Sequence, residues 1–116
     1  MDKTIRRSRA EGSVTAPSSK SYAQRAVAAA LLCEGTSTLT NTILCDDTRA
    51  ALQVAADLGA EVEAGTDGTT YTVRGGLRPH AQAIHIGESG LAARLFTPIA
   101  ALCGARITIT GRGSIL

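Results

Sequence analysis

The sequence has few aromatic residues, few charges and no long hydrophobic run. Its 116 residues include no Trp, one Phe and two Tyr, and only 19% of them are charged. The 12 basic and 10 acidic side chains leave a net charge of +2, which argues against a nucleic-acid-binding or membrane-surface protein, because both need a concentrated basic face. The longest uncharged apolar stretch, residues 26–33, is far shorter than the roughly 20 residues that cross a bilayer.

With so few rings, the hydrophobic core has to be built from Leu, Ile, Val and the 20 alanines. The 44% hydrophobic content is enough for one small globular domain and excludes wholesale disorder. Such a core buries little hydrophobic surface for a chain of this length. We therefore expect either very close packing of the elements or an apolar surface that takes a partner.

The three cysteines, Cys33, Cys45 and Cys103, lie far apart and form no Cys-rich motif. We therefore expect no metal site, and we expect buried, reduced thiols. The basic start, residues 1–10, has no apolar run behind it and so is not a secretory signal. Together these features predict a soluble, cytoplasmic protein.

Periodicity predicts three helices that alternate with short strands. The first helix begins at Ser18 or Ser19 and is stopped by Gly35, and a cap at Asp46 or Asp47 starts the second. The third runs from about residue 89 to 103 and contains a proline that should bend it. Strands are expected at 37–43, 61–64, 70–74, 83–86 and 106–110, with one or two edge strands within 4–14. The order indicates an α/β (α+β) fold with helices packed against a mixed sheet.

The most informative segment is residues 18–25, SSKSYAQR, at the start of the first helix. A helix N-terminus favours anions through its free N–H groups and its dipole. Lys20 and Gln24 are four residues apart, as are Ser21 and Arg25, so we expect these four side chains to form one polar face. This arrangement predicts a phosphate or carboxylate site. From spacing alone, an ordinary serine cap with solvated Lys and Arg side chains is the alternative.

A second candidate site lies where a strand leads through residues 87–90, GESG, into the third helix. Gly90 would let a ligand approach the backbone closely, and Arg94 follows in the second turn. The segment has neither the Gly-Xaa-Ser-Xaa-Gly order of a hydrolase nucleophile elbow nor the Gly-Lys-Ser/Thr ending of a phosphate-binding Walker loop. By itself, a glycine turn before a capped helix is also consistent with a purely structural role.

Four segments together resemble the EPSP synthase (3-phosphoshikimate 1-carboxyvinyltransferase) family. Residues 17–26, PSSKSYAQRA, resemble its PGSKSxxNRA motif, and residues 32–41, LCEGTSTLTN, resemble LAEGTTTLxN. Residues 46–48 match its DDT, and residues 87–94, GESGLAAR, resemble GNSGTAMR. Because the motifs occur in the family's order and spacing, the resemblance covers nearly the whole chain.

The resemblance implies part of the enolpyruvyl transferase fold, in which βαβαββ units build two domains with the active site between them. Members are much longer than this chain, so residues 16–116 would be the first unit and the start of the next. Residues 1–15 would be a strand segment that belongs to the other domain. We therefore expect the chain to be a piece of the enzyme that is inactive by itself, with the remainder of the same enzyme chain as its partner.

The family's reaction moves the enolpyruvyl group of phosphoenolpyruvate to the 5-hydroxyl of shikimate 3-phosphate and needs no cofactor or metal. By matching position, the resemblance implies that Lys20 is catalytic and contacts both substrates. Ser21 and Arg25 would bind shikimate 3-phosphate. Gly90 would contact phosphoenolpyruvate, and Arg94 would support the pocket.

Three positions depart from the family pattern. Gln24 stands where Asn is usual, and Glu88 and Leu91 replace Asn and Thr of the glycine turn. Glu88 would place a negative charge near the anion site, and Leu91 removes a hydroxyl. Two alternatives stay open: an enzyme like UDP-N-acetylglucosamine enolpyruvyl transferase, which typically lacks the Lys20, Ser21 and Arg25 combination, and a non-catalytic anion-binding module.

Overall fold

The structure, a computed structural model, describes residues 2–116. Three α-helices alternate with five short strands, and a single 3-10 turn follows the last strand. In chain order the elements are α1 (Lys20–Leu32), β1 (Thr36–Leu39), α2 (Asp46–Asp57), β2 (Glu61–Ala64), β3 (Tyr71–Arg74), β4 (Ala83–His85), α3 (Gly90–Ala101), β5 (Thr108–Thr110) and η1 (Gly113–Ile115). This order confirms the expected alternation, and the α/β (α+β) class with it.

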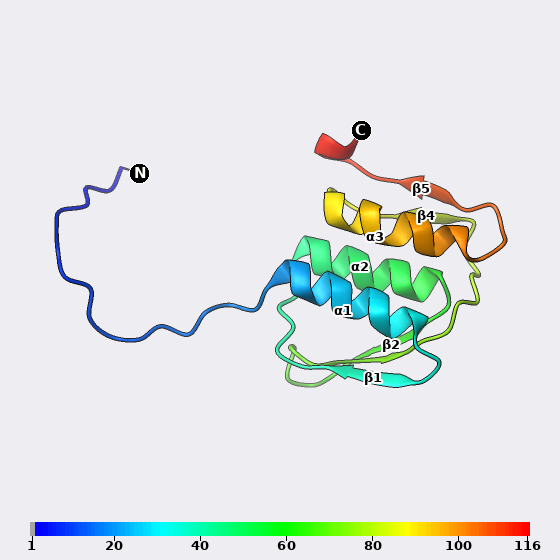
Figure 1. The fold of residues 1–116 in the computed structure, drawn as a ribbon, viewed down its shortest axis with the longest axis horizontal. Helices are drawn as coiled ribbons and strands as arrows, with labels where there is room; N and C mark the ends of the chain where they lie inside the picture. The colour runs from blue at the N-terminus through cyan, green and yellow to red at the C-terminus, as the bar shows by residue number, and fades with distance from the viewer. Residues whose placement is uncertain (1) are drawn as a thin grey trace.

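The three helices run in the same direction, so their N-termini lie at one end of the molecule (Figure 1). Helix α1 packs against α2 and over β1 and β3, while α2 also contacts β2 and β4, and α3 packs against both other helices. No helix in the described part of the chain has the length and hydrophobicity needed to cross a bilayer. The shared direction of the helices is what gathers the predicted site segments.

The strands form two separate sheets. In the three-stranded antiparallel sheet, β3 lies between β1 and β2, and Tyr71 pairs with Leu39 on one side and Ala64 on the other. The second sheet is the parallel pair β4 and β5, with Ile84 opposite Ile109. The prediction of one mixed sheet was therefore wrong in its pairing, because the antiparallel and parallel ladders do not share a strand.

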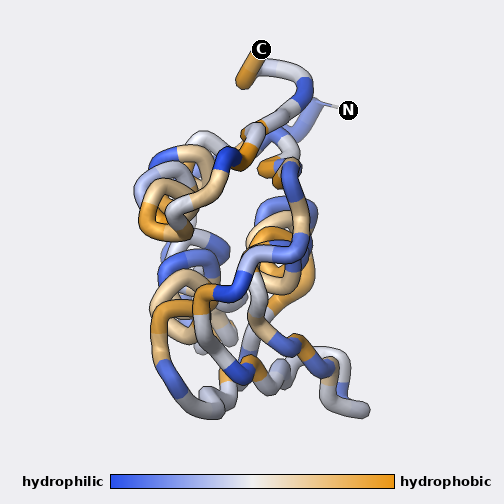
Figure 2. The backbone as a smooth tube through the Cα atoms, turned by 90° about the vertical axis from the view of Figure 1, so that its right-hand side faces the viewer, coloured by the Kyte–Doolittle hydropathy of each residue, from blue (hydrophilic) through white to orange (hydrophobic). Residues whose placement is uncertain are grey.

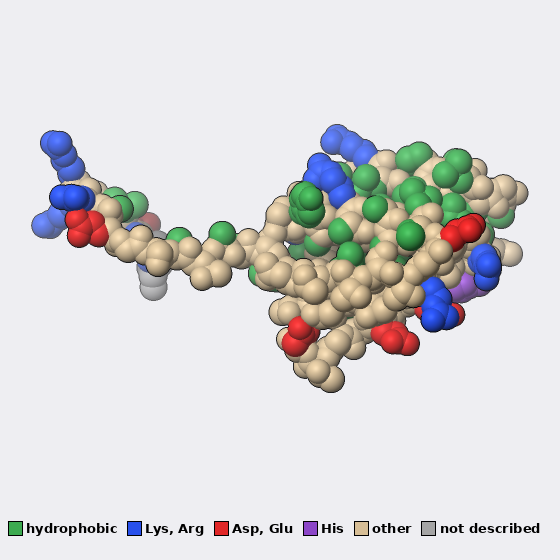
Figure 3. Space-filling model, turned by 60° about the horizontal axis from the view of Figure 1, so that its bottom comes forward, with side chains coloured by type: hydrophobic (Ala, Val, Ile, Leu, Met, Phe, Trp, Pro, Cys, Tyr) green, Lys and Arg blue, Asp and Glu red, His purple; other side chains and the backbone are tan. Residues whose placement is uncertain are grey.

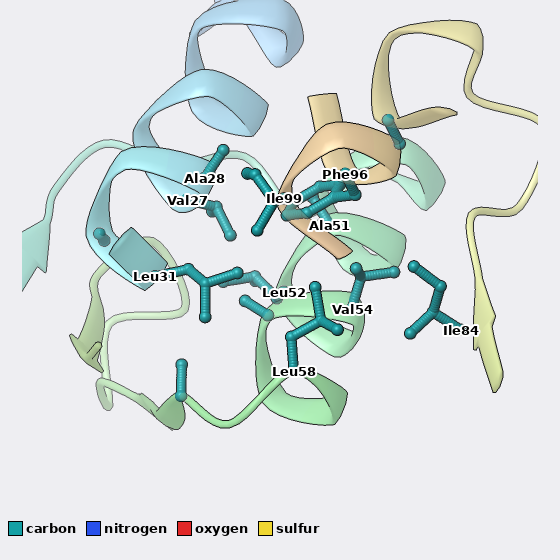
Figure 4. Close-up of a cluster of buried hydrophobic side chains, with 14 of the residues drawn as sticks. Val27, Ala28, Leu31, Ala51, Leu52, Val54, Leu58, Ile84, Phe96 and Ile99 are labelled. Carbon is teal, nitrogen blue, oxygen red and sulfur yellow. The ribbon is translucent and has the colours of Figure 1, made fainter. Parts of the chain in front are cut away.

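The core lies between the helices and the two sheets. Phe96, the only Phe, is fully buried, and around it pack aliphatic side chains and alanines from all three helices (Figure 4). Hydrophobic and hydrophilic segments alternate around each helix, as expected for helices that bury one face (Figure 2). The small alanines Ala28, Ala51 and Ala55 let the helices approach closely, which compensates for the scarcity of rings.

Gly75 shows how closely the first helix approaches the antiparallel sheet. A Cβ on Gly75 would lie 2.0 Å from the carbonyl oxygen of Ala30 and 2.2 Å from that of Cys33. The backbone N–H of the following glycine, Gly76, donates to the carbonyl of Leu31 at 2.8 Å. A residue without a side chain is therefore required where β3 passes the C-terminus of α1.

Residues 2–19 form an extended arm that leaves the body at the start of α1 (Figures 1 and 3). The arm is exposed, with Ile5 at 92% and Val14 at 95%, and basic side chains gather toward its far end. The edge strands predicted within 4–14 are absent from the described arm, so that prediction was wrong. A strand needs a neighbouring edge to hydrogen-bond with, and no part of the described body lies beside residues 4–14.

Two local predictions need correction. The first helix ends with Cys33 as its C-cap in extended conformation, two residues before the predicted stop at Gly35. The thiols are free but not buried, since Cys33 is exposed and Cys45 and Cys103 are half-buried. All three follow or precede helix ends, where the chain turns toward the surface.

Candidate anion-binding site at three helix N-termini

The starts of α1, α2 and α3 are joined by two side-chain contacts at one end of the molecule. Lys20 at the start of α1 forms an ion pair with Asp47 in the first turn of α2, with Nζ 2.8 Å from Oδ2. Gln24, one turn further along α1, accepts a hydrogen bond from the hydroxyl of Ser89, the N-cap of α3, at 2.7 Å. The segments that the sequence singled out are therefore brought together.

Lys20 presents an ammonium group at the surface of this region. Ser19, one of the two predicted caps, is the N-cap of α1 and accepts the N–H of Tyr22, which places Lys20 in the first turn. Its side chain is 66% exposed. The hydrogen bond that the ammonium donates to Asp47 and the charge of that carboxylate raise the pKa of Lys20 above its ordinary value. An ammonium has three N–H donors, so two remain for a ligand after the bond to Asp47.

Ser21 and Arg25 follow on the same helix. Arg25 is exposed, and its Nη1 donates to the carbonyl oxygen of Ser21 at 3.2 Å, so the guanidinium folds back along α1. Ser21 is half-buried. Among the described residues Arg25 forms no ion pair with a carboxylate, which leaves its charge available to an anion.

The start of α3 offers backbone donors. Ser89 caps the helix by accepting the N–H of Ala92 at 3.1 Å, and the N–H groups of Gly90 and Leu91 have no acceptor among the residues that the structure describes. Nothing lies within 4 Å of the position that a Cβ of Gly90 would take. Neither the backbone conformation nor internal packing requires glycine there, so the open space is accessible to a ligand. Arg94, one turn on, is exposed.

Gln24 does not lie on the exposed polar face where the sequence analysis placed it. It is 1% exposed, and its Nε2 donates to the carbonyl oxygen of Lys20 at 3.4 Å while its Oε1 accepts from Ser89. The helical spacing was correct, but α3 covers this side of α1 and buries the amide. The polar face therefore consists of Lys20, Ser21 and Arg25 without Gln24.

The start of α2 also differs from the prediction. Its N-cap is Cys45, and both aspartates fall in the first turn. Burial raises the pKa of the Cys45 thiol, but hydrogen bonds from the Thr48 hydroxyl and from the backbone N–H groups of Thr48 and Asp47 lower it more, so its pKa lies below the ordinary value. The backbone N–H groups at the start of α2 thus stabilise the negative charge of a thiolate at this position.

The charge of Glu88 is balanced within the structure. Its Oε1 lies 3.6 Å from Nε of Arg112, and Nη2 of the same guanidinium lies 4.0 Å from Oδ2 of Asp46. These groups border an open cleft of about 420 Å³ between α2 and the segments around residues 87 and 112. Arg112 thus lies between Glu88, next to the start of α3, and Asp46, in the first turn of α2. Leu91 is half-buried in the first turn of α3.

This arrangement can bind anions. It combines the Lys20 ammonium, the guanidinium groups of Arg25 and Arg94, and the free N–H groups at Gly90. Among the described residues Arg94, like Arg25, forms no ion pair. Cations and N–H dipoles that are positioned in advance stabilise charge on a phosphate or carboxylate. The structure brings together the α1 and α3 segments that carry all five predicted site residues.

Sequence reasoning missed three contributors to this region. The partner of Lys20, Asp47, was assigned only a capping role. Gln24 was placed on the surface, and Arg112 was given no role. The signal for Asp47 was its place at the start of a helix that had to pack beside α1, but no local pattern marks an ion pair between residues 27 positions apart.

Comparisons with known proteins agree on one family. The family model of EPSP synthase (3-phosphoshikimate 1-carboxyvinyltransferase) matches residues 5–116. The 3-phosphoshikimate 1-carboxyvinyltransferase of Methanothermobacter thermautotrophicus is 36% identical over 116 residues, covering 99% of this chain and 28% of the relative. That of Chlamydia caviae is 38% identical over 105 residues, covering 90% of this chain and 24% of the relative.

A solved structure, EPSP synthase from Acinetobacter baumannii, matches with a TM-score of 0.72 and 29% identity. The match covers 89% of this chain and 24% of the solved one. The chain therefore spans about a quarter of the length of the relatives it matches. With both the sequence motifs and the arrangement of elements shared, the chain belongs to the EPSP synthase (3-phosphoshikimate 1-carboxyvinyltransferase) family.

Proposed function

We propose that this chain supplies one half of the active site of a 3-phosphoshikimate 1-carboxyvinyltransferase. In that reaction the 5-hydroxyl oxygen of shikimate 3-phosphate becomes bonded to the enolpyruvyl carbon of phosphoenolpyruvate. The bond from that carbon to the phosphate oxygen breaks and phosphate is released. The observation that carries the proposal is the family membership together with the position of the starts of α1 and α3, which are Lys20 and Gly90, at one end of the helices.

Each predicted residue has a setting that suits its proposed role. Lys20, with two free N–H donors, contacts both substrates and is the catalytic residue of this half-site. Ser21 and Arg25, on the same helix, bind shikimate 3-phosphate. The exposed N–H of Gly90 binds phosphoenolpyruvate, and Arg94 supports the pocket from the next turn. Both substrates are anionic, which matches the positive end of three helices.

The proposal also covers the organisation of the longer enzyme. Residues 16–116 form the first unit and the start of the next, and residues 1–15 belong with the second domain. The remainder of the same enzyme chain completes the site from the other side of the cleft. The enzyme acts in the cytoplasm, in the shikimate pathway that leads to chorismate and the aromatic amino acids.

A titration of the 116-residue chain with shikimate 3-phosphate, followed by backbone amide shifts, tests the half-site. We expect saturable shifts at Lys20, Ser21 and Arg25, with no release of phosphate when phosphoenolpyruvate is added. Lys20→Met should abolish these shifts because it removes the only ammonium at the helix starts. Lys3→Met, which removes the other lysine of the chain in the exposed arm, is the matched control and should leave the shifts intact.

The outcomes separate the competing functions. Shifts that respond to phosphate alone as strongly as to shikimate 3-phosphate would indicate a general anion-binding module. A well-folded chain that responds to neither ligand would contradict a preformed half-site. Detectable phosphate release by the isolated chain would overturn the view that the other half of the site is needed.

A further inference from the structure

We propose that Gln24 is a positioning residue that sets the start of α3 relative to Lys20. The inference rests on the proposed function, because it concerns how the two halves of one anion site are aligned. Gln24 touches neither proposed substrate. It acts through the groups on either side of it, the backbone of Lys20 and the hydroxyl of Ser89.

A continuous chain of hydrogen bonds runs through the Gln24 side chain. Its Nε2 donates to the carbonyl oxygen of Lys20 at 3.4 Å, and its Oε1 accepts from the Ser89 hydroxyl at 2.7 Å. The Ser89 oxygen in turn accepts the N–H of Ala92 at 3.1 Å. The first residue of α1 is thus connected to the first turn of α3 through one amide and one hydroxyl.

Burial makes this connection specific. Gln24 is 1% exposed and Ser89 is 4% exposed, so water cannot replace either partner without opening the contact between α1 and α3. A buried amide or hydroxyl that loses its partner carries an unmet hydrogen bond, so each side chain holds the other in place. Within the described part of the chain, this is the hydrogen bond that ties the side chains of α1 to the cap of α3.

The proposed substrates depend on this contact to different degrees. The groups assigned to shikimate 3-phosphate, those of Lys20, Ser21 and Arg25, all lie on α1 and move together. Phosphoenolpyruvate takes Lys20 from α1 and the N–H of Gly90 from α3. The phosphoenolpyruvate site therefore forms only when the start of α3 keeps its position relative to the start of α1. Holding that position is the role we assign to Gln24.

The test compares the two ligands in variants of the 116-residue chain. In Gln24→Met, which keeps the side-chain length but not the hydrogen bonds, we expect the affinity for phosphoenolpyruvate to fall about tenfold. The affinity for shikimate 3-phosphate should change by less than about twofold. Ser89→Gly, which removes the hydroxyl but leaves a residue tolerated at an N-cap, should have the same selective effect.

The double variant and a matched control test the coupling. If the two side chains act as one unit, Gln24→Met with Ser89→Gly should cost no more affinity than either change alone. Gln53→Met makes the same substitution at an exposed glutamine, whose Nε2 donates to Asp57 on α2, and should leave both affinities unchanged. Equal losses for both ligands, or a loss in the control, would overturn the proposal in favour of a general structural effect.

A readout without ligand separates this proposal from the proposed function. Amide hydrogen exchange at Ala92 and Ala93 should accelerate in Gln24→Met while exchange in the centre of α2 stays unchanged. If the unmodified chain bound neither ligand, the preformed half-site would be contradicted, and the exchange result would still decide whether Gln24 fixes the start of α3. Unchanged exchange at the start of α3 would overturn the positioning role.

Discussion

Lys20 carries one of the three positive charges of the candidate site, and among the described residues of that site it is the one that pairs with a carboxylate, that of Asp47. The carboxylate accepts a hydrogen bond from the ammonium at 2.8 Å and raises its pKa. The same contact fixes a flexible side chain at the gap between α1 and α2. Asp47 therefore lowers the net positive charge of the site and leaves two N–H donors of the exposed Lys20 ammonium for a ligand.

Asp47→Asn should lower the pKa of Lys20. The ammonium would lose its strongest acceptor and the neighbouring negative charge, so it would release its proton at a lower pH than in the unmodified chain. The stabilisation from this ion pair is complete below the ordinary value of 10.5 and is lost as the pH rises through the raised value. NMR titration of the lysine Cε signals measures the shift.

The chain has two lysines, and Lys3 in the arm provides the internal reference. Its signal should not respond to Asp47→Asn, because the arm does not contact α2. A Lys20 titration midpoint that stayed the same in the variant would contradict the role assigned to Asp47.

At the scale of single residues, the sequence predicted those contacts that join residues close to one another along the chain. Ser19 and Ser89 were recognisable as caps because a cap and its N–H lie three residues apart. The burial of Gln24 was not predictable, since its partner Ser89 is 65 positions away and α3 determines which side of α1 is covered. Candidate site residues could be named from the sequence, but the alignment of the helices that carry them could not.

At the scale of secondary-structure elements, the turn between β2 and β3 is stabilised by hydrogen bonds to one carboxylate, that of Asp67. Asp67 accepts hydrogen bonds from the N–H groups of Thr69 and Thr70 and from the Thr70 hydroxyl, the last at 2.7 Å. The Thr70 hydroxyl and the two N–H groups lower the pKa of Asp67 to about 2. The ionised form therefore stabilises the turn that pairs Tyr71 with Ala64.

Asp67→Ala should destabilise the chain at neutral pH and lose that effect in acid. Because the folded pKa of about 2 lies below the ordinary 3.8, the stabilisation is complete above 3.8 and disappears as the pH falls through 2. Urea unfolding of both proteins between pH 7 and pH 2 should show the two midpoints converging. Asp2→Ala in the arm is the control, and a gap that stayed constant with pH would contradict the prediction.

Element positions were predicted better than element pairings. The strand at Glu61–Ala64 was predicted at its observed bounds, because alternating apolar residues and an Asp-Gly turn are local signals. That β1 joins the hairpin while β4 pairs with β5 depends on how α2 packs between β2 and β4. The hydrophobic periodicity of the sequence does not predict how these elements pack.

The whole molecule consists of a compact body and an arm, which together extend over 58 × 33 × 20 Å. Within the described arm, the ion pair between Arg9 and Glu11 joins two arm residues rather than arm and body. Ser18 is the first residue with a hydrogen bond to the body, accepting the N–H of Ile43 at 3.0 Å. The stability of the body should therefore depend on the chain only from about this residue onward.

Deletion of residues 2–15 should change the free energy of unfolding by less than about 0.5 kcal/mol, as expected for exposed residues without partners. Deletion of residues 2–19 is the matched comparison. It also removes the serine that accepts the N–H of Ile43 and the N-cap of α1, and should cost about 1 kcal/mol or more. Urea unfolding of the unmodified chain and of both deletion variants measures the two losses in the free energy of unfolding. An equal loss from both deletions would mean that the arm itself packs on the body, and would contradict its proposed place beside the second domain.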